Sequence, residues 1–246
     1  MIYEQSWPVE ELFDCLPDVV FFVKDAAGNY VVVNNTLVKR CGADSKSALV
    51  GKTPSQVLGP DLGVSYEKQD RTVLKTGEPI LNQLELHVYP NRSIGWCLTN
   101  KRALRDANGV MTGLTGVSQD LRTPDMSHEP SKQLQPVMEY AADHLSDPPD
   151  INTLSAIADL SPYQLDRRVR RVFGLSTGQW ILKQRLDLAR QQLLQTDFPI
   201  AEIAFNAGYR DQSAFTRQFV RATGFTPSAF RQARGKNIQA PPKGSV

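Results

Sequence analysis

An internal repeat in the C-terminal half constrains the fold of this chain more than any other feature. The segment LSAIADLS at residues 154–161 aligns with IAFNAGYR at residues 203–210, and an apolar pattern with helical spacing follows each of them. A repeat of this kind predicts two similar helix–turn–helix units. The apolar positions, which fall on one helix face, are Leu165, Val169 and Val172 in the first unit and Phe215, Phe219 and Ala222 in the second.

Two capping boxes mark helix starts in this half. Ser161 pairs with Gln164 in the first box, and Ser176 pairs with Gln179 in the second. The second box opens a run without proline over residues 177–195, which predicts one continuous helix. At 1.5 Å per residue this helix is about 28 Å long.

The turns of the two units are predicted from single residues. Gly208 supplies the left-handed backbone conformation that a tight turn needs, and Asp159 takes the matching place in the first unit. Asp211 is positioned to cap the helix that follows the second turn.

The helix faces that point away from the apolar positions carry polar and basic residues. At 100° per residue, Tyr163 and Arg167 lie about 140–200° from Leu165, and Ser213 and Arg217 lie on the matching face of the second unit. Packing in the core therefore does not explain them. Arginine offers a planar fork for guanine edges or phosphates. Solvated faces of two core helices are the simpler alternative, but the repetition of the pattern favours base reading.

The charge distribution agrees with nucleic acid as a partner of the second half. Residues 1–130 hold 13 Lys and Arg against 16 Asp and Glu, whereas residues 131–246 hold 15 against 10. The halves therefore carry net charges of −3 and +5. Because successive major-groove faces of B-DNA lie about 34 Å apart, a chain with a rigid spacer of the predicted length could read two adjacent segments.

The chain reads as two domains joined by a linker. Residues 122–133, RTPDMSHEPSKQ, hold two prolines and almost no apolar side chain. The N-terminal half alternates short β-branched and aromatic runs with turns, as in VVFFV, DAAGN and YVVV. We expect an α+β domain over residues 1–122, a linker over 123–131, an all-helical domain over 132–234 and a disordered tail over 235–246.

Cysteine usage and hydropathy exclude several classes of protein. Cys15, Cys41 and Cys97 are dispersed and show no CxxC spacing, so neither a disulfide framework nor a zinc cluster is predicted. The sequence has no signal pattern and no apolar run of 18 residues, which predicts a cytoplasmic protein without membrane contact.

The helical half closely resembles the DNA-binding domain of AraC/XylS-family transcription regulators. The resemblance is carried by LSPYQLDRRVRRVFG, RLDLARQQLL and IAEIAFNAGYRDQSAFTRQFVRATGFTPSAFR. It implies a seven-helix domain in which one helix of each unit enters the major groove of double-stranded DNA. The implied base readers are Tyr163, Asp166 and Arg167 in the first unit and Gln212, Ser213, Thr216 and Arg217 in the second. The implied phosphate contacts are Arg168, Arg171, Arg210 and Arg221.

The N-terminal half resembles a PAS domain. The resemblance rests on PDVVFFVKDAAGNYVVVNN, LVGKT, TGEPI and RALRDANGVMTGLTGVSQDLR. It implies a five-stranded antiparallel sheet that covers a pocket, used to bind a small molecule or to form a homodimer. Alternation along the strands predicts which residues face this pocket: Phe22, Val32, Tyr66, Leu98 and Asn100.

Other residues of this half have simpler interpretations. We expect His87 to be an exposed strand residue and Asn34 to cap a helix. Trp96 fits a place in the core or in a dimer contact better than a ligand clamp. Asp120 either pairs with a basic residue or is solvated. No cofactor is predicted: a flavin-attachment motif is missing, and the segment 60–76 holds no haem ligand.

Three functional hypotheses remain. The first is a transcription regulator whose PAS domain senses an effector, and the second is a regulator whose PAS domain only dimerises. The third is an enzyme, because some relatives of the helical domain are fused to DNA-repair activities, but the scattered cysteines do not match the zinc cluster and reactive thiol that these need. No catalytic or metal-binding residue is predicted. A regulator of this kind also allows a contact with RNA polymerase.

Overall fold

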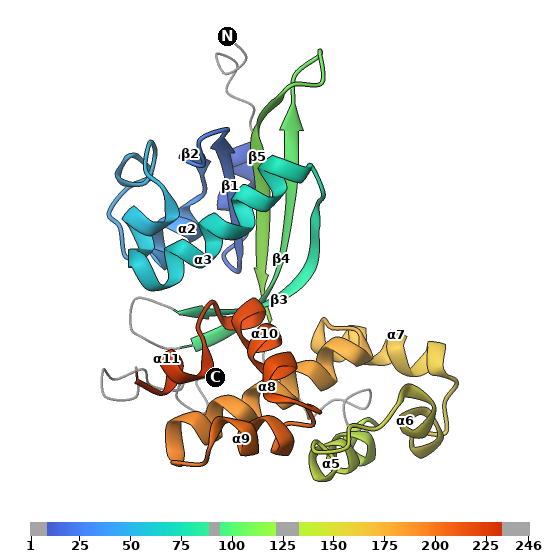
Figure 1. Cartoon of the computed structure of the whole chain (residues 1–246). Helices are drawn as coiled ribbons and strands as arrows, with labels where there is room; N and C mark the ends of the chain where they lie inside the picture. The colour runs from blue at the N-terminus through green and yellow to red at the C-terminus, as the bar shows by residue number, and fades with distance from the viewer. Residues whose placement is uncertain (1–8, 89–93, 122–132, 233–246) are drawn as a thin grey trace. The chain divides into compact units, whose positions relative to one another are not determined.

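The computed structural model describes residues 9–88, 94–121 and 133–232, which form two compact units (Figure 1). We call residues 9–120 the sheet unit and residues 133–232 the helical unit. The predicted linker over 123–131 and the predicted tail over 235–246 lie outside the described residues.

The sheet unit is built on five antiparallel strands in the order β2-β1-β5-β4-β3. Strand β1 pairs with β2 and β5, and β4 pairs with β5 and β3, so the first and last strands along the chain meet in the centre of the sheet. The strands are β1 Val19–Asp25, β2 Tyr30–Val33, β3 Ile80–Val88, β4 Ile94–Arg105 and β5 Met111–Asp120.

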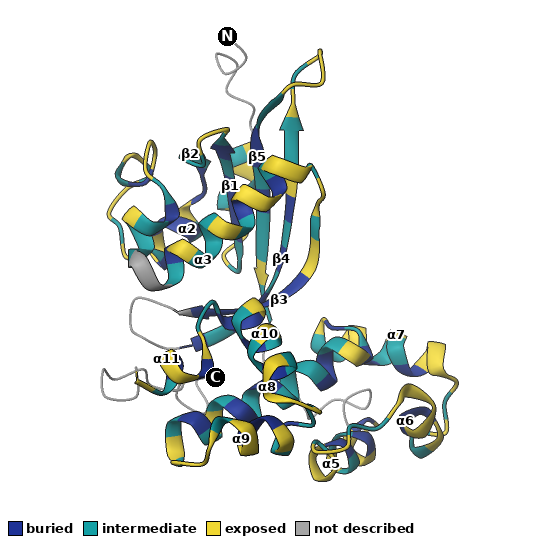
Figure 2. Ribbon diagram, in the orientation of Figure 1, coloured by how far each residue is buried: buried dark blue, intermediate teal, exposed yellow. Residues whose placement is uncertain are grey.

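Four helical segments accompany the sheet: α1 Val9–Asp14, α2 Asn35–Arg40, η1 Lys46–Ala48 and α3 Pro54–Thr76. Helix α1 and helix α2 pack on β1, and α3 crosses β4 and β5. The backbone of α3 is interrupted at Gly59, whose φ of 80° is not helical. The buried core lies between these helices and the sheet (Figure 2) and includes Val20, Phe22, Val33, Leu37 and Leu114.

Asn34 confirms the predicted helix cap and holds more of the fold together. Its side-chain oxygen accepts a hydrogen bond from the backbone N–H of Leu37 at 3.2 Å, in the first turn of α2. The same oxygen accepts from Phe21 in β1, and its amide nitrogen donates to the carbonyl of Val19. A single buried amide therefore joins β1 to the start of α2.

The helical unit contains seven helices among residues 133–232, as predicted. They are α5 Gln135–Asp143, α6 Ile151–Ile157, α7 Pro162–Phe173, α8 Thr177–Gln195, α9 Ile200–Asn206, α10 Gln212–Thr223 and α11 Pro227–Gln232. Helix α8 packs against α7, α9 and α11, so it is the centre of this unit. The α+β sheet unit followed by this all-α unit confirms the predicted fold class.

Local signals in the sequence determine where these helices begin. Both capping boxes are formed, at Ser161 before α7 and at Ser176 before α8. Asp211 caps α10 by accepting a hydrogen bond from the Ala214 N–H at 2.7 Å. Both turns contain a left-handed residue, Asp159 with φ 51° and Gly208 with φ 76°.

Candidate functional site

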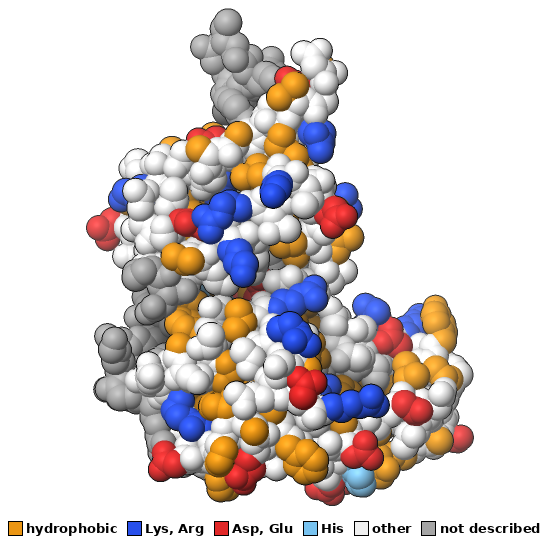
Figure 3. All heavy atoms as spheres, in the orientation of Figure 1, with side chains coloured by type: hydrophobic (Ala, Val, Ile, Leu, Met, Phe, Trp, Pro, Cys, Tyr) orange, Lys and Arg blue, Asp and Glu red, His pale blue; other side chains and the backbone are white. Residues whose placement is uncertain are grey.

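Helices α7 and α10 bury one face and expose the other. Leu165 and Phe215 are fully buried, whereas Tyr163 is 75% exposed. Most of the predicted base readers are exposed, namely Arg167, Gln212, Ser213 and Arg217, and Thr216 is half-buried. Most of the predicted phosphate contacts are also exposed, namely Arg171, Arg210 and Arg221, and Arg168 is half-buried. Basic side chains reach the surface of the helical unit where α7 and α10 lie (Figure 3). The polar face therefore has the exposure that a nucleic-acid interface needs.

The carboxylate of Asp166 is engaged in contacts within the helical unit. Its carboxylate accepts a hydrogen bond from the backbone N–H of Thr177 at 2.7 Å, at the first residue of α8, and pairs with Arg170 at 2.7 Å. Burial alone would raise the pKa of Asp166, but these hydrogen bonds hold it below its ordinary value. Because the carboxylate is engaged at the N-terminus of α8, Asp166 joins α7 to α8 and leaves the set of predicted base readers.

Arg185 holds the second helix-turn-helix unit against α8, a role that no sequence pattern indicated. Its Nε donates to the carbonyl of Ala207 at 2.7 Å, and its Nη2 donates to the carbonyl of Gly208 at 2.7 Å. The guanidinium also lies 4.0 Å from the centre of the Tyr209 ring. Helix α8 is therefore fixed to the turn that precedes α10.

The sheet unit contains a partly open cavity of about 40 Å³ between the sheet and its helices. Apolar side chains such as Val20, Leu37 and Leu58 form part of its wall. The Phe22 ring also lines it and lies over Gly116 on β5, where a Cβ would come within 2.3 Å of the ring. The rest of the lining is unusually polar for the interior of a domain.

Two lysines and one aspartate form a buried ionic cluster at this cavity. Asp70 on α3 accepts hydrogen bonds from Lys24 on β1 and from Lys101 on β4, the latter at 2.7 Å. Burial lowers the pKa of Lys24 to about 8, and Asp70 offsets only part of this effect. Burial alone would raise the pKa of Asp70, but the two ammonium groups hold it below its ordinary value.

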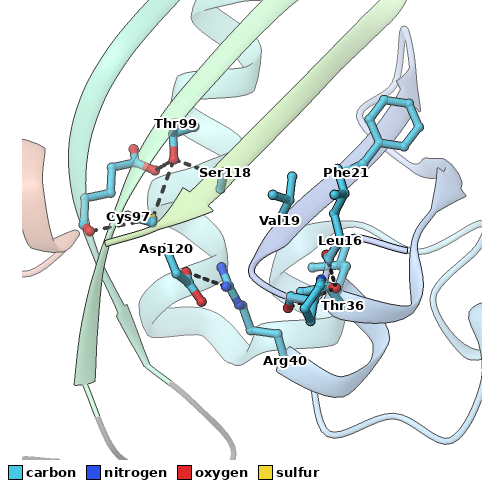
Figure 4. Close-up of polar contacts among 12 residues, drawn as sticks. Leu16, Val19, Phe21, Thr36, Arg40, Cys97, Thr99, Ser118 and Asp120 are labelled. Atoms are coloured by element: carbon cyan, nitrogen blue, oxygen red, sulfur yellow. Dashed lines mark hydrogen bonds and ion pairs between the residues drawn. The ribbon is translucent and has the colours of Figure 1, made fainter. Parts of the chain in front are cut away.

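A second polar cluster surrounds Glu85 on β3. Its carboxylate accepts hydrogen bonds from Gln69 at 2.6 Å, Gln83 at 2.7 Å and Thr99 at 2.6 Å. Thr99 in turn contacts Ser118 on β5 at 2.9 Å (Figure 4). Glu85, Thr99 and Ser118 all line the cavity.

The predicted pocket residues are only partly correct. Phe22 and Tyr66 line the cavity, but Val32, Leu98 and Asn100 do not. On β4 the side chains that reach the cavity are Cys97, Thr99 and Lys101, which have the opposite parity to Leu98 and Asn100. On β4 the prediction took the opposite parity of the alternation from the one that the structure shows, and the inward face is polar.

His87 corrects a further expectation for the same reason. It is 8% exposed and lines the cavity, so it is not an exposed strand residue. Burial, followed by the charge of Arg40, lowers the pKa of His87 well below its ordinary value, and the ring is neutral at neutral pH. Trp96 is buried but does not line the cavity, which agrees with a place in the core.

Asp120, at the end of β5, pairs with a basic residue as one interpretation predicted. Arg40 at the end of α2 donates a hydrogen bond from Nη2 to its carboxylate (Figure 4). Arg40 is 4% exposed and also lines the cavity. The pair therefore connects the cavity wall to the last residue of the sheet.

The cysteines do not form the site that the enzyme hypothesis requires. Cys15, Cys41 and Cys97 are all free thiols. Burial raises the pKa of both Cys41 and Cys97 to about 12, so neither is a reactive thiolate at neutral pH. In the ranges that the structure describes, we find no group of three metal-binding side chains and no helix long and apolar enough to cross a bilayer.

Comparisons with known proteins match both units. A helix-turn-helix domain family matches residues 154–233, and a PAS fold family matches residues 13–124. The arabinose operon regulatory protein of Salmonella typhimurium is 36% identical over 106 residues, which are 42% of this chain and 38% of that protein. The chain thus spans just over a third of the length of this relative.

A further relative and a solved structure match a similar fraction of the chain. The regulatory protein SoxS of Salmonella typhimurium is 34% identical over 106 residues, which are 43% of this chain and 97% of SoxS. A solved DNA-binding domain of AdpA in complex with a target DNA shares 33% identity over 44% of this chain and 98% of that domain, with a TM-score of 0.40. From the SoxS match and the two family matches, the chain belongs to the AraC family of helix-turn-helix transcription regulators and carries a PAS domain in its N-terminal half.

Proposed function

We propose that this protein is a sequence-specific transcription regulator that reads two adjacent major-groove segments of DNA with α7 and α10. The observation that carries the proposal is the attachment of both helix-turn-helix units to one helix, α8. Asp166 fixes α7 to the N-terminus of α8, and Arg185 fixes the turn before α10 to the same helix. The two exposed faces are thereby held on one rigid support.

The dimensions support this arrangement. The 19 residues of α8 form one uninterrupted helix, which is about 28 Å long at 1.5 Å per residue. Adjacent major-groove faces on one side of B-DNA lie about 34 Å apart. Base readers held in one orientation by such a support would meet an asymmetric site, without the need for a symmetric dimer.

The proposed contacts divide into readers and phosphate anchors. Side chains on the polar faces that can form hydrogen bonds with base edges are assigned to reading, and further basic side chains of α7, α10 and the turn before α10 are assigned to phosphates. The proposed readers are Tyr163, Arg167, Gln212, Ser213, Thr216 and Arg217. The proposed anchors are Arg168, Arg171, Arg210 and Arg221.

Selection of bound sequences from a random DNA pool tests the proposal. We expect two separate blocks of preferred bases whose centres lie about one helical turn apart, near 10 base pairs. Arg167→Ala should relax the preference in one block only, and Arg217→Ala should relax it in the other. Arg102→Ala, which removes an exposed arginine of the sheet unit, is the matched control. A single block, or preferences that neither variant changes, would contradict the assignment.

We further propose that the PAS domain controls DNA binding through an effector in its cavity or through pairing with a second copy. A cavity lined by charged and hydrogen-bonding groups supports the first route. Deletion of residues 1–122 should abolish any response to the effector and leave intrinsic DNA binding. If the truncated chain keeps the same response, the effector does not act through this domain. Purification with a bound small molecule would favour sensing over dimerisation alone.

A further inference from the structure

Besides Arg40, whose charge is paired with Asp120, two groups of opposite charge face the cavity of the sheet unit. The first, which we call the positive pole, is the cluster of Lys24, Asp70 and Lys101. Two ammonium groups share one carboxylate in it, so with all three ionised its net charge is +1. The three side chains are at most 3% exposed. The rings of Phe22 and Tyr30 lie 4.8 and 4.4 Å from the Lys24 nitrogen and add cation–π stabilisation.

The second group, which we call the negative pole, is the carboxylate of Glu85. Glu85 is 3% exposed, and its three hydrogen-bond donors, Gln69, Gln83 and Thr99, are all neutral. Neutral donors satisfy the lone pairs of a carboxylate but leave its charge in place. A charge removed from water is stabilised most strongly by a partner of opposite sign. Each pole is therefore suited to a ligand group of the opposite charge.

The spacing of the poles limits the size of such a ligand. Thr99, which donates a hydrogen bond to Glu85, and Lys101, which belongs to the positive pole, are two residues apart on the same face of β4. Their backbone positions are therefore about 7 Å apart along the strand. In an α-amino acid, two bonds of about 1.5 Å separate the nitrogen from the carboxyl carbon. With a hydrogen bond of about 2.9 Å at each end, the molecule spans a comparable distance. The cavity volume of about 40 Å³ favours a short molecule as well.

We propose that the cavity binds a small zwitterion, an α-amino acid with a short aliphatic side chain. Its carboxylate would lie at Lys24 and Lys101 and its ammonium group at Glu85. The apolar wall of Val20, Leu37 and Leu58 would take the side chain. This inference rests on the sensory role proposed above for the PAS domain, and it names the chemical class of the effector.

Calorimetry on the full chain tests the chemical class with defined probes. Alanine and glycine carry both charges, whereas propionate and ethylammonium each carry only one. We expect alanine to bind at least tenfold more tightly than either singly charged probe. Equal binding of propionate overturns the zwitterion, and so does the lack of both a binding heat and a shift in unfolding temperature with millimolar alanine and glycine.

Three variants assign the two ends of the ligand. Glu85→Gln keeps an oxygen that can accept from Thr99, and it should weaken alanine at least tenfold while it leaves propionate almost unchanged. Lys101→Met should weaken both alanine and propionate. Arg102→Met removes the cation of the neighbouring exposed residue and should change neither. Unfolding curves without ligand establish that each variant is folded. A folded Glu85→Gln variant that binds alanine as tightly as the parent overturns the proposed orientation.

The outcome for the ligand can be separated from the outcome for DNA binding. The same protein preparation is used for selection from the random DNA pool, with and without alanine. If defined sequences are enriched but no amino acid binds, the zwitterion proposal fails and the regulator proposal stands. If alanine binds but no sequence is enriched under either condition, the regulator proposal fails and the ligand site stands.

Discussion

In the sheet unit the cations Lys24, Arg40 and Lys101 point inward and are at most 4% exposed, whereas in the helical unit Arg167 and Arg217 are exposed to solvent. The inward cations each contact a carboxylate: Asp70 serves both lysines, and Asp120 serves the arginine. The same residue types thus occupy opposite environments in one chain.

The difference follows from what each environment does to a charge. A buried ion loses its hydration and needs a fixed partner, so the sheet unit depends on its charged clusters for stability. An exposed arginine keeps its hydration and is available to a polyanion, so it contributes little to folding and much to binding. This contrast predicts that charge removal destabilises the sheet unit and weakens binding by the helical unit.

The largest expected effect concerns the shared carboxylate. Asp70→Asn leaves two buried ammonium groups without their counter-ion, and we expect a loss of about 3–5 kcal/mol in the stability of the sheet unit. Hydrogen exchange of the β1 and β4 amides measures this stability without interference from the helical unit. The control Asp44→Asn changes an exposed aspartate and should stay within about 0.5 kcal/mol. Equal hydrogen exchange of the β1 and β4 amides in Asp70→Asn and Asp44→Asn would contradict the expected destabilisation of the sheet unit by loss of a buried charge.

In the helical unit the largest stability effect should come from the backbone rather than from a charge. Gly208 has φ 76°, and a Cβ at this position would lie 2.4 Å from the Leu145 carbonyl oxygen. Gly208→Ala should therefore destabilise this unit by about 1–3 kcal/mol through strain alone. Gly178 on α8 has open space around it, and Gly178→Ala should be neutral or stabilise by up to about 1 kcal/mol. Thermal unfolding of the two variants gives the comparison.

Arg217→Ala is expected to separate binding from folding. We expect it to weaken binding to a selected DNA site by about 1–3 kcal/mol and to relax one base position. The stability of the helical unit should change by less than about 0.5 kcal/mol, because the side chain is exposed. Titration of labelled DNA and a thermal melt measure the two quantities. A destabilised variant with normal affinity would show that Arg217 serves the fold.

Asp166→Ala should do the opposite of Arg217→Ala: it should change the stability of the helical unit rather than its contacts with DNA. Its effect is the smallest of the four. Loss of the carboxylate at the start of α8 should destabilise the helical unit by about 1–2 kcal/mol, as the loss of a helix cap does. Because the folded pKa of Asp166 is lowered, its contribution is present above the ordinary carboxyl pKa of about 4 and is lost as the pH falls through the folded value. The stability difference between parent and variant should therefore shrink in acid. A difference that persists below the folded pKa would assign the stabilisation to another group.

Local signals were sufficient to predict the helical unit. The boxes at Ser161 and Ser176 act on neighbouring backbone groups, so the starts of α7 and α8 could be predicted, and α8 ends at the predicted Gln195. The left-handed conformation of Gly208 is likewise a property of that residue and its turn. The helical period alone separated the buried Phe215 from the exposed Arg217.

Alternation along a strand identifies two faces but does not say which one faces the cavity. In β4 the polar face of Thr99 and Lys101 is the inner one because α3 supplies Asp70. In β3 the same helix supplies Gln69 to Glu85. These partners are far apart in the sequence, and for that reason the wall of the cavity could not be predicted from the period of the strands.

Tertiary contacts also explain why sequence patterns did not reveal the structural roles of Asp166 and Arg185. The helical period gave the direction of Asp166 on α7 but not the return of the chain, which brings Thr177 to its carboxylate. Arg185 binds main-chain oxygens of Ala207 and Gly208. A hydrogen bond to the main chain does not require a complementary side chain, so no sequence pattern could predict this contact.

The bonds of Arg185 to main-chain carbonyls have a consequence for how such a protein can change over time. The carbonyl of residue 207 is present whatever side chain is attached there, and the turn itself needs only the glycine at 208, where a Cβ would meet the Leu145 carbonyl oxygen. Substitutions along the exposed side of α10 therefore leave the hydrogen bonds of Arg185 to the second helix-turn-helix unit unchanged. During evolution, substitutions of single base-contacting residues could therefore change the target sequence while the orientation of α10 stays the same.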